Sequence, residues 1–506
     1  MLAFILSNLT GLVRQVLILK AFGTENALDA FNAASTYTDL LFSLIAGGAL
    51  ASAFVPTFTA FLAKEDRTSA WRLASALSNL VLLILCLTSL LSGLFAPQLI
   101  KLVLAPKFTP PLQELTATLL RVLLIAPAVF GLSGLFMGIL NAHQVFFWPA
   151  LAPTMYWLGM ILGVLFLAPS MGVYGLAWGA VLGAILHLLV QLPAFLALPA
   201  RRYSRTLGLS SPPLRQVGRL MAPRLLGVAV VQINFVVNTI LATGQPEGSL
   251  TALKSAWAVM TMPQVVIAQA IAIAALPTFS AQVARGELGE MRRSLAGTLR
   301  SVVFLSLPAA IGMILLRAPI ISMLFERGQF DMHSSQLVAW ALLWYAAGLV
   351  GHSLVEVISR AFYALQDTKT PVLVGVAAMS LNLLFSLFFS AIFEWTGWMP
   401  HGGLALANSL ATALETAALL YFMHRRLNGL NGRFVLVGGA QAALATLVMS
   451  LLLGIWLSWT KGLNAWLVGG GGVVIGGICY AATTLVLRVP EAQELLSLLP
   501  RPNRQA

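Results

Sequence analysis

The sequence predicts an all-α integral membrane protein with about fourteen transmembrane helices. Three observations lead to this fold class: the composition, the length of the apolar runs, and the basic residues in alternate connectors. Apolar residues make up 59% of the 506 residues, whereas Asp, Glu, Lys and Arg together make up only 9%. Soluble domains carry about 25% charged residues. Because so few charges could not cover a surface in water, we expect lipid to be the solvent.

The apolar runs favour helices over a membrane β-barrel. In lipid the backbone must satisfy its own hydrogen bonds, so only helices and closed barrels span a bilayer. Barrel strands are ~10 residues long and alternate in polarity, whereas a helical span needs ~20 mostly apolar residues. Reading between polar connectors places helices at residues 2–20, 29–62, 71–95, 111–141, 147–168, 171–197, 216–242, 249–283, 290–316, 334–364, 371–394, 401–424, 433–458 and 464–488.

Alternate connectors differ in basic content, and this difference orients the chain. One set holds clusters such as Arg201, Arg202 and Arg205, whereas the other set holds isolated cations such as Lys461. Lys and Arg accumulate on the cytoplasmic side of membrane proteins. Both termini are therefore predicted to be cytoplasmic, which requires an even number of spans. The net charge of +13 lies in these connectors, so it does not indicate nucleic-acid binding.

Three pairs of short motifs recur at one spacing and predict an internal duplication. Phe108 matches Phe330 and Pro149 matches Pro371 at an offset of 222, and Pro56 matches Pro277 at an offset of 221. The repeat unit contains six helices, so both copies have the same orientation and are related by a pseudo-two-fold axis along the membrane normal. Such paired bundles enclose a cavity and alternate access by rocking.

The duplication sets the predicted domain organisation. We expect an N-terminal six-helix lobe at residues 1–197, a cytoplasmic linker at 198–215 and a C-terminal six-helix lobe at 216–426. The linker is placed where Arg, Ser and Pro accumulate. Two further helices at 427–490 and a cytoplasmic tail at 491–506 lie outside the repeat.

Ionisable residues inside a span cost ~3 kcal/mol on insertion scales, so each is a candidate functional residue. Arg14 is interpreted as a cation that lines a cavity, or as the partner of an acid such as Asp29 or Asp39. Asp29 begins a helix, where a carboxylate suits the positive end of the helix dipole. Asp39 lies deeper, in a cavity or an ion pair. Lys254 either faces the cavity or reaches the membrane interface.

Other polar residues in the predicted spans have mainly structural interpretations. Glu356 and Arg360 have the i,i+4 spacing of an intrahelical ion pair. Asn238, Asn382 and Asn408 form either an ion site or, as we favour, interhelical hydrogen bonds. Glu415 lies in the middle of a span and needs a partner from another helix.

No motif indicates catalysis, a metal site or a bound cofactor. A Walker loop for ATP is absent from the sequence, and the six histidines lack metal-ligand spacing. Cys86 and Cys479 are interpreted as isolated apolar residues. ATP hydrolysis would therefore need a partner protein, and the energy sources that remain for the chain itself are the membrane potential and a gradient of Na⁺ or H⁺.

Four sequence motifs together resemble a known family. They are the strings at residues 360–371 (RAFYALQDTKTP), 22–31 (FGTENALDAF), 53–56 (AFVP) and 324–330 (LFERGQF). They are similar to the motifs of the MurJ/MviN family of lipid II flippases, within the MOP exporter superfamily. The resemblance extends from residue 7 to about residue 430 and identifies the chain as a divergent member.

The resemblance implies a fold, a substrate and a location. Members have fourteen helices in two lobes and reside in the bacterial inner membrane. They flip undecaprenyl-pyrophosphate-linked disaccharide-pentapeptide outward for peptidoglycan synthesis, through a cationic cavity that suits a pyrophosphate. A groove at the last two helices, residues 427–490 here, would hold the lipid tail. The implied partners are this precursor and membrane lipids, and the chain would act as a monomer.

The family's cavity cations are only partly present in this chain. The resemblance places Arg14 at a conserved position of the pattern, whereas Asn8, Phe42 and Ala258 stand where the pattern has arginine. Lys254 lies one helical turn before Ala258 and could substitute in part. Asn238 stands where some members have a sodium-binding aspartate.

The resulting cavity prediction consists of Arg14, Lys254, Asp39 and Asn8. The missing cations keep two alternatives open. The chain could export another polyprenyl-linked glycan or a small molecule, or it could be a scaffold for envelope synthesis that does not transport.

Overall fold

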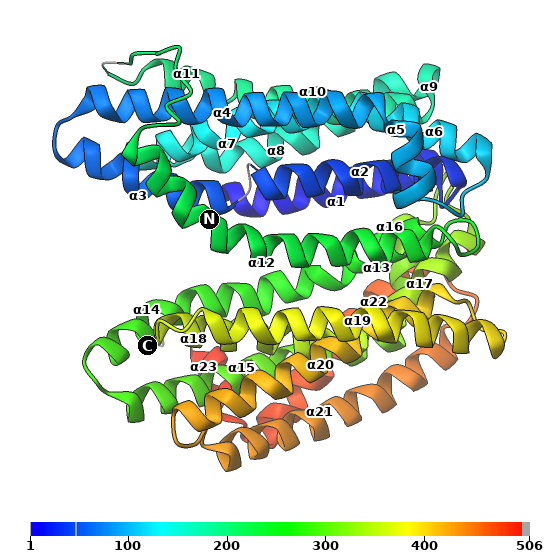
Figure 1. The fold of residues 1–506 in the computed structure, drawn as a ribbon. Helices are drawn as coiled ribbons and strands as arrows, with labels where there is room; N and C mark the ends of the chain where they lie inside the picture. The colour runs from blue at the N-terminus through cyan, green and yellow to red at the C-terminus, as the bar shows by residue number, and fades with distance from the viewer. Residues whose placement is uncertain (1, 46–47, 200, 498–506) are drawn as a thin grey trace, which may run out of the picture. The chain divides into compact units, whose positions relative to one another are not determined.

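The computed structural model describes residues 2–45, 48–199 and 201–497, and over these residues the regular secondary structure is entirely helical (Figure 1). The helices are α1 (Leu2–Phe22), α2 (Asn26–Ile45), α3 (Gly48–Ala63), α4 (Arg67–Leu94), α5 (Ala96–Leu99), α6 (Pro110–Leu123), α7 (Ile125–Ala142), α8 (Phe147–Leu162), α9 (Ala168–Met171), α10 (Val173–Leu189), α11 (Leu192–Leu196), α12 (Pro212–Ala242), α13 (Ser249–Gln264), α14 (Ala270–Ala284), α15 (Leu288–Leu315), α16 (Arg317–Phe325), α17 (Met332–Ala347), α18 (Leu349–Ala364), α19 (Lys369–Trp395), α20 (His401–Arg426), α21 (Gly432–Trp459), α22 (Ala465–Val486) and α23 (Pro490–Ser497). Short π-helical segments occur at η1 (Ile100–Leu104), η2 (Gly163–Leu167) and η3 (Val265–Gln269).

Many of these helices are suited to a membrane. Within the described residues, ten are long and apolar enough to cross a bilayer, or eleven if α17 and α18, which are bent by 46°, count as one span. The other predicted spans coincide with α1, with α2 and α3, and with α12. Within the described residues, Val231–Ala242 of α12 forms a shorter apolar helix. The number of fourteen therefore stays a prediction.

The predicted duplication reappears in the helix bounds. Helices α4 and α15 begin 221 residues apart and end 221 residues apart, and each is 28 residues long. Gln144 and Gln366, which are 222 residues apart, both have left-handed backbones, with φ of 61° and 57°. Residues other than glycine rarely adopt this conformation. Its recurrence at the repeat spacing supports a common origin of the two segments.

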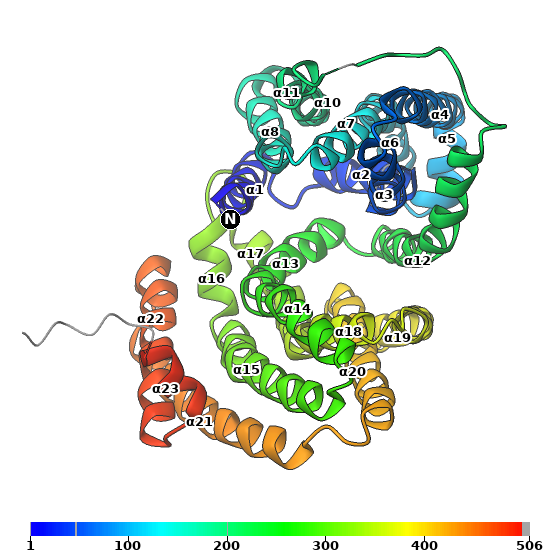
Figure 2. The same ribbon diagram turned by 90° about the vertical axis from the view of Figure 1, so that its left-hand side faces the viewer.

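The first compact unit comprises Met1–Thr251 together with Arg327–Asp331. Within it, α8 packs on α1 and α10, α7 packs on α4 and α10, and α2 packs on α6 and α12. Figure 2 shows the helices of this unit from nearly end-on. Helix α12 was assigned to the second lobe from the sequence, but it packs on α2 and α3 here. The division by packing therefore differs from the predicted linker at 198–215.

Glycines bring α8 and α10 into close contact. A Cβ atom added to Gly159 would lie 2.2 Å from the Cα of Gly183, and one added to Gly163 would lie 2.4 Å from the Cα of Gly179. Glycines spaced four residues apart allow the backbones of membrane helices to approach closely. This packing fixes the neighbouring turn of α8, which carries Tyr156.

The second unit comprises Ala252–Glu326 and Met332–Ala506. Helix α19 packs on α20, α15 packs on α18 and α21, and α22 packs on α16 and α21. The described residues of the predicted tail at 491–506 belong to α23, which packs on α22.

Helix α23 is attached to the second unit by a buried ion pair. Arg300 Nε on α15 lies 2.5 Å from Glu491 Oε1, and the two side chains are only 5% and 11% exposed. Arg300 Nη2 also donates to Gln441 Oε1 at 3.1 Å, and the guanidinium lies 4.5 Å from the ring centre of Phe434. The Cβ of an alanine at position 438 would lie 2.3 Å from Arg300 Nε, so Gly438 makes room for this cation.

Candidate functional site

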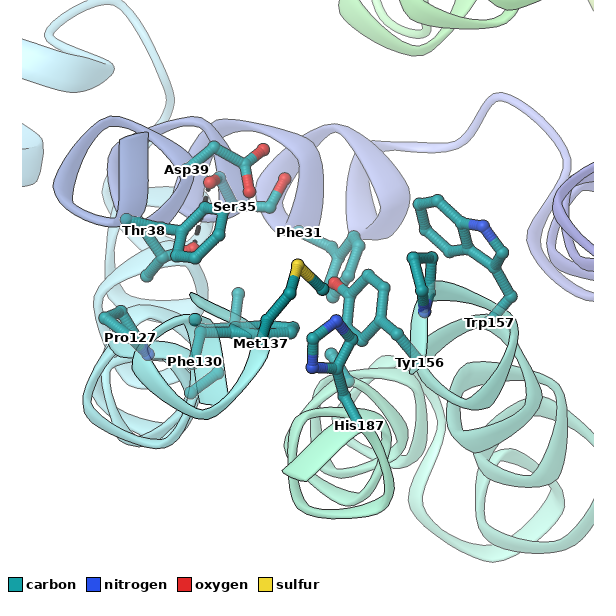
Figure 3. A pocket seen from close by; sticks show the side chains of 16 residues that line it. Phe31, Ser35, Thr38, Asp39, Pro127, Phe130, Met137, Tyr156, Trp157 and His187 are labelled. Carbon is teal, nitrogen blue, oxygen red and sulfur yellow. Dashed lines mark hydrogen bonds between the residues drawn. The ribbon is translucent and has the colours of Figure 1, made fainter. Parts of the chain in front are cut away.

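A pocket of about 460 Å³ opens in the interior of the first unit, among α2, α6, α7, α8 and α10 (Figure 3). Its lining combines aromatic, aliphatic and a few polar side chains. They are Phe31, Ser35, Thr38, Asp39, Phe42, Leu123, Ala126, Pro127, Phe130, Gly134, Met137, Pro153, Tyr156, Trp157, Ala180 and His187. Pro153 lies inside α8, where it removes a backbone hydrogen bond and loosens the helix.

The aromatic rings form a connected wall. The ring centres of Phe42 and Phe130 are 5.2 Å apart, those of Phe130 and Tyr156 are 5.0 Å apart, and those of Tyr156 and Trp157 are 4.8 Å apart. These separations lie in the range of favourable aromatic pairs. The rings come from α2, α7 and α8, so the packing of three helices holds the wall in place.

The polar edge of the pocket is carried by α2. Ser35, Thr38 and Asp39 have the i, i+3, i+4 spacing that places side chains on one face of a helix. Figure 3 shows Ser35 and Asp39 next to each other on this face. The Thr38 hydroxyl donates to the backbone carbonyl of Ser35 at 2.9 Å. Asp39 is exposed and is one of the residues that line the pocket.

His187 closes the pocket on the side of α10, and its ring is held by a buried network. His187 Nδ1 lies 2.7 Å from the hydroxyl of Ser133, which also accepts a hydrogen bond of 2.7 Å from Gln191 Nε2. All three side chains are buried. Sequence reasoning missed this group because Ser133 is 54 residues away from His187. The i,i+4 spacing of His187 and Gln191 was the one signal available.

Arg14 lies beside the aromatic wall. Its guanidinium carbon is 4.2 Å from the ring centre of Trp157, and its Nη2 donates to Gln15 Oε1 at 3.0 Å. A cation over an aromatic face is stabilised by the ring quadrupole. Arg14 Nε is buried and has no hydrogen-bond partner among the residues that the structure describes. Asp39 is close enough to interact electrostatically with Arg14.

The other predicted cavity residues are placed differently. Asn8 is exposed on α1, six residues before Arg14, and does not line the pocket. Lys254 is half-buried on α13 and belongs to the second unit. Of the four predicted residues, the pocket therefore brings together Asp39, directly, and Arg14, through Trp157.

Asp29 lies in the first turn of α2, as predicted, but its carboxylate contacts another helix. Its Oδ2 accepts from the amide of Gly248 at 2.9 Å, and its Oδ1 accepts from the amide and hydroxyl of Thr251 at 2.8 and 2.6 Å. Asp29 is 3% exposed. The helix start that it caps is that of α13, which the sequence could not indicate.

In the second unit, Glu356 and Arg360 form the predicted ion pair on α18. Asn408 lies 3.0 Å from His352 Nε2 through its side-chain oxygen, and Asn382 is buried on α19. The contact between α18 and α20 fits the interhelical interpretation of Asn408, and that of Asn382 stays a prediction.

The third asparagine of the predicted ion site lies in the first unit. Asn238 donates to Asn234 on the same helix, at 2.9 Å. Over the described part of the chain, no cluster of three or more His, Cys, Asp or Glu side chains has the arrangement of a metal site.

The chain is similar to known proteins over most of its length. A family model described as "Lipid II flippase MurJ" matches residues 18–486. The lipid II flippase MurJ of Burkholderia cenocepacia is 30% identical over 429 residues, which cover 83% of this chain and 82% of that protein. A probable lipid II flippase MurJ of Vibrio cholerae is 29% identical over 503 residues, covering 96% and 94% of the two chains.

Solved structures share the fold. A lipid II flippase MurJ in an inward closed conformation has a TM-score of 0.81 at 24% identity, covering 98% of this chain and 99% of the other. An inward-facing multidrug resistance transporter of the MATE family in the MOP superfamily has a TM-score of 0.70 at 17% identity, covering 84% and 96%. At these identities the likeness extends to the fold alone.

Proposed function

The chain belongs to the lipid II flippase MurJ family, and we propose from this membership that it moves lipid II from the inner to the outer leaflet of the bacterial plasma membrane. The many apolar helices and the family together make it a multi-pass membrane protein. Lipid II is a lipid-linked precursor, which the family resemblance describes as carrying its glycan on a pyrophosphate. A protein that moves it needs a cation for the pyrophosphate and room for the head group.

Arg14 is the observation that supports an anionic substrate. It is half-buried, and its Nε lacks a hydrogen-bond partner within the described residues. A guanidinium offers five donors in a planar fork that suits phosphate oxygens. Burying a donor without a partner costs ~1–3 kcal/mol, so an anionic ligand at Arg14 would recover that cost.

We further propose how the transport cycle is arranged. The two six-helix repeats would alternate access around a central cavity, with fourteen spans, both termini in the cytoplasm and a single chain as the working unit. The cycle would be driven by the membrane potential or by a gradient of H⁺ or Na⁺. The position of Phe42 in the aromatic wall, where the family pattern has arginine, favours one alternative, namely export of a different polyprenyl-linked glycan.

Replacement of the essential lipid II flippase of a bacterial host tests this function. The host flippase is depleted while this chain is expressed, and both growth and the outer-leaflet lipid II are measured. We expect rescue by the wild type. We expect Arg14→Ala to reduce the flipped lipid II by roughly tenfold or more, because hydrogen bonds to charged groups contribute about 1.5–3 kcal/mol each.

One control and one further variant define the outcome. The control, Lys461→Ala, removes an exposed cation from a connector and should rescue growth like the wild type. The further variant, Lys254→Ala, tests the second predicted cavity cation and should impair rescue as Arg14→Ala does. If the wild type reaches the membrane but does not restore outer-leaflet lipid II, another glycan lipid is the substrate.

A further inference from the structure

The pocket of the first unit combines three features that one class of ligand satisfies together. It has a wall of aromatic faces, an edge with a carboxylate and two hydroxyls, and a cation next to the wall. A sugar attached to a phosphate has the matching parts: apolar C–H faces, several hydroxyls and an anion.

The aromatic wall suits the flat face of a sugar ring. Phe42, Phe130 and Tyr156 come from three helices and form a continuous set of ring contacts. Aromatic side chains offer a large apolar surface with a negative face, against which the slightly positive C–H groups of a sugar pack well. A strongly hydrated group such as a free phosphate would lose its water against this wall without compensation.

The edge on α2 suits sugar hydroxyls. Asp39 is exposed and lines the pocket, and Ser35 and Thr38 lie within one turn of it. A carboxylate only accepts hydrogen bonds, and the hydroxyls of Ser35 and Thr38 already donate to the backbone carbonyls of Asn32 and Ser35. All three groups can therefore accept hydrogen bonds from neighbouring sugar hydroxyls, which act as the donors. They would thereby fix the orientation of a ring that stacks on the wall.

The cation lies at the end of the wall. The guanidinium of Arg14 rests on the ring of Trp157, which itself lines the pocket. A phosphate bound at Arg14 and a sugar bound in the pocket would therefore share one indole. The same cation makes the pocket unfavourable for a hydrophobic cation, which the aromatic wall and Asp39 would otherwise attract.

The volume limits what can enter. A cavity of about 460 Å³ is at the small end of ligand pockets, which span ~300–1,000 Å³. It can take a sugar and its substituents, but not a peptide or a polyprenyl tail in addition.

We propose that this pocket is a glycan subsite, which holds the sugar next to the pyrophosphate of the lipid-linked substrate. The proposal rests on the proposed function, because it assumes a glycan carried on a pyrophosphate.

A binding experiment with two probes tests the subsite. The full chain in nanodiscs is titrated with a short-chain prenyl pyrophosphate, and with the same lipid carrying an N-acetylhexosamine on its pyrophosphate. We expect the wild type to bind the glycosylated probe roughly three- to tenfold more tightly, the range of one or two aromatic contacts. Asp39→Asn and Phe130→Leu should each reduce this ratio toward one. Arg14→Gln should weaken both probes.

The matched control is Phe166→Leu, which makes the same change as Phe130→Leu at a ring that is 71% exposed on η2. It should keep the wild-type ratio. Thermal unfolding of each variant in the same nanodiscs identifies any variant that fails to fold. If Phe130→Leu fails to fold, Asp39→Asn, which changes an exposed side chain, still tests the pocket.

The outcomes separate the two proposals. If both probes bind equally to the wild type, or if neither pocket variant changes the ratio, the glycan subsite is wrong and the flippase function stands. If neither probe binds to the wild type or to Arg14→Gln, the chain does not recognise a prenyl pyrophosphate, and the proposed function itself is contradicted. If tetraphenylphosphonium binds instead and Asp39→Asn abolishes its binding, the pocket is a site for hydrophobic cations.

Discussion

At the scale of single residues, Asp29 links two helix starts within the first unit. Its carboxylate is 3% exposed and accepts three hydrogen bonds from Gly248 and Thr251. Amide groups at a helix start point outward and favour a negative charge. The carboxylate therefore connects the start of α2 with the start of α13, and its loss would leave buried donors without partners.

Replacement of Asp29 by alanine should destabilise this connection by about 3 kcal/mol, since hydrogen bonds to charged groups are worth about 1.5–3 kcal/mol each and do not add fully. Hydrogen exchange of the amides at Gly248 and Thr251 should accelerate, and the midpoint of thermal unfolding in detergent should fall. Glu25→Ala removes an exposed carboxylate from the same segment and should change neither. Unchanged exchange in Asp29→Ala would refute the capping role.

Asp66 offers a test by pH, outside the membrane-spanning helices. It precedes α4 and accepts from the amide of Ser69 at 3.0 Å. Hydrogen bonds from the side chain and the backbone of Ser69 lower the pKa of Asp66 below its ordinary value. The charged form is thus favoured by folding. Its stabilising effect is complete above the ordinary pKa, about 3.9, and disappears as the pH falls through the lowered pKa.

We expect the amide of Ser69 to lose protection from hydrogen exchange, beyond the intrinsic change in rate, as the pH falls below about 4. In Asp66→Asn this extra loss should be absent, because the side-chain amide of asparagine does not titrate in this range. Glu287 stands before α15 at the equivalent repeat position and makes no side-chain cap. We therefore expect Glu287→Gln to have no effect on how the protection of amides at the start of α15 changes with pH.

At the scale of elements, the ion pair between Arg300 and Glu491 joins α15 to α23, the last helix of the described chain, next to α21. Removing one partner of a buried pair costs ~3–5 kcal/mol, because the remaining charge stays buried. Space for the cation depends on Gly438, whose missing side chain leaves room for the arginine stem. Helix α23 is therefore held in place by the ion pair, and this pair in turn depends on the space that Gly438 leaves on α21.

Two adjacent glycines on α21 test this condition. Gly438→Ala should displace Arg300 and release α23, which we expect to cost ~2 kcal/mol or more, since overpacking typically costs 1–3 kcal/mol. Limited proteolysis at α23 should become faster. Gly439→Ala is the control, because a Cβ at that position meets no atom within 4 Å. Equal proteolysis of the two variants would contradict the steric explanation.

The elements also show what the sequence could predict. Long apolar runs located the helices, and spaced Pro and Phe residues revealed the repeat, because both signals are local or periodic. Asp39 was a candidate for a cavity or an ion pair because a charge in a span is costly, and it lines the pocket. The pocket was not predictable, since His187 and Phe130 come together only when distant helices pack. Arg300 was overlooked, because its partner Glu491 is 191 residues away.

At the scale of the whole molecule, the basic connectors make a topological prediction. We replace Cys86 and Cys479 with serine and introduce single cysteines at Arg205 or Lys461, both exposed. If fourteen helices span and both termini are cytoplasmic, a membrane-impermeant maleimide should label Lys461→Cys in intact cells. It should label Arg205→Cys only after permeabilisation. Labelling of Arg205→Cys in intact cells would reverse the orientation.

The contact of Asp29 with Thr251 has a consequence for the origin of the chain. The two residues are 222 apart, which is the repeat offset, so each touches its own counterpart in the other copy. In an ancestor made of two identical single-repeat chains, a residue at this contact would have met itself, as in any isologous dimer. Two aspartates would have repelled each other. An acid facing a hydroxyl became possible once the gene had been duplicated, because the two positions could then diverge.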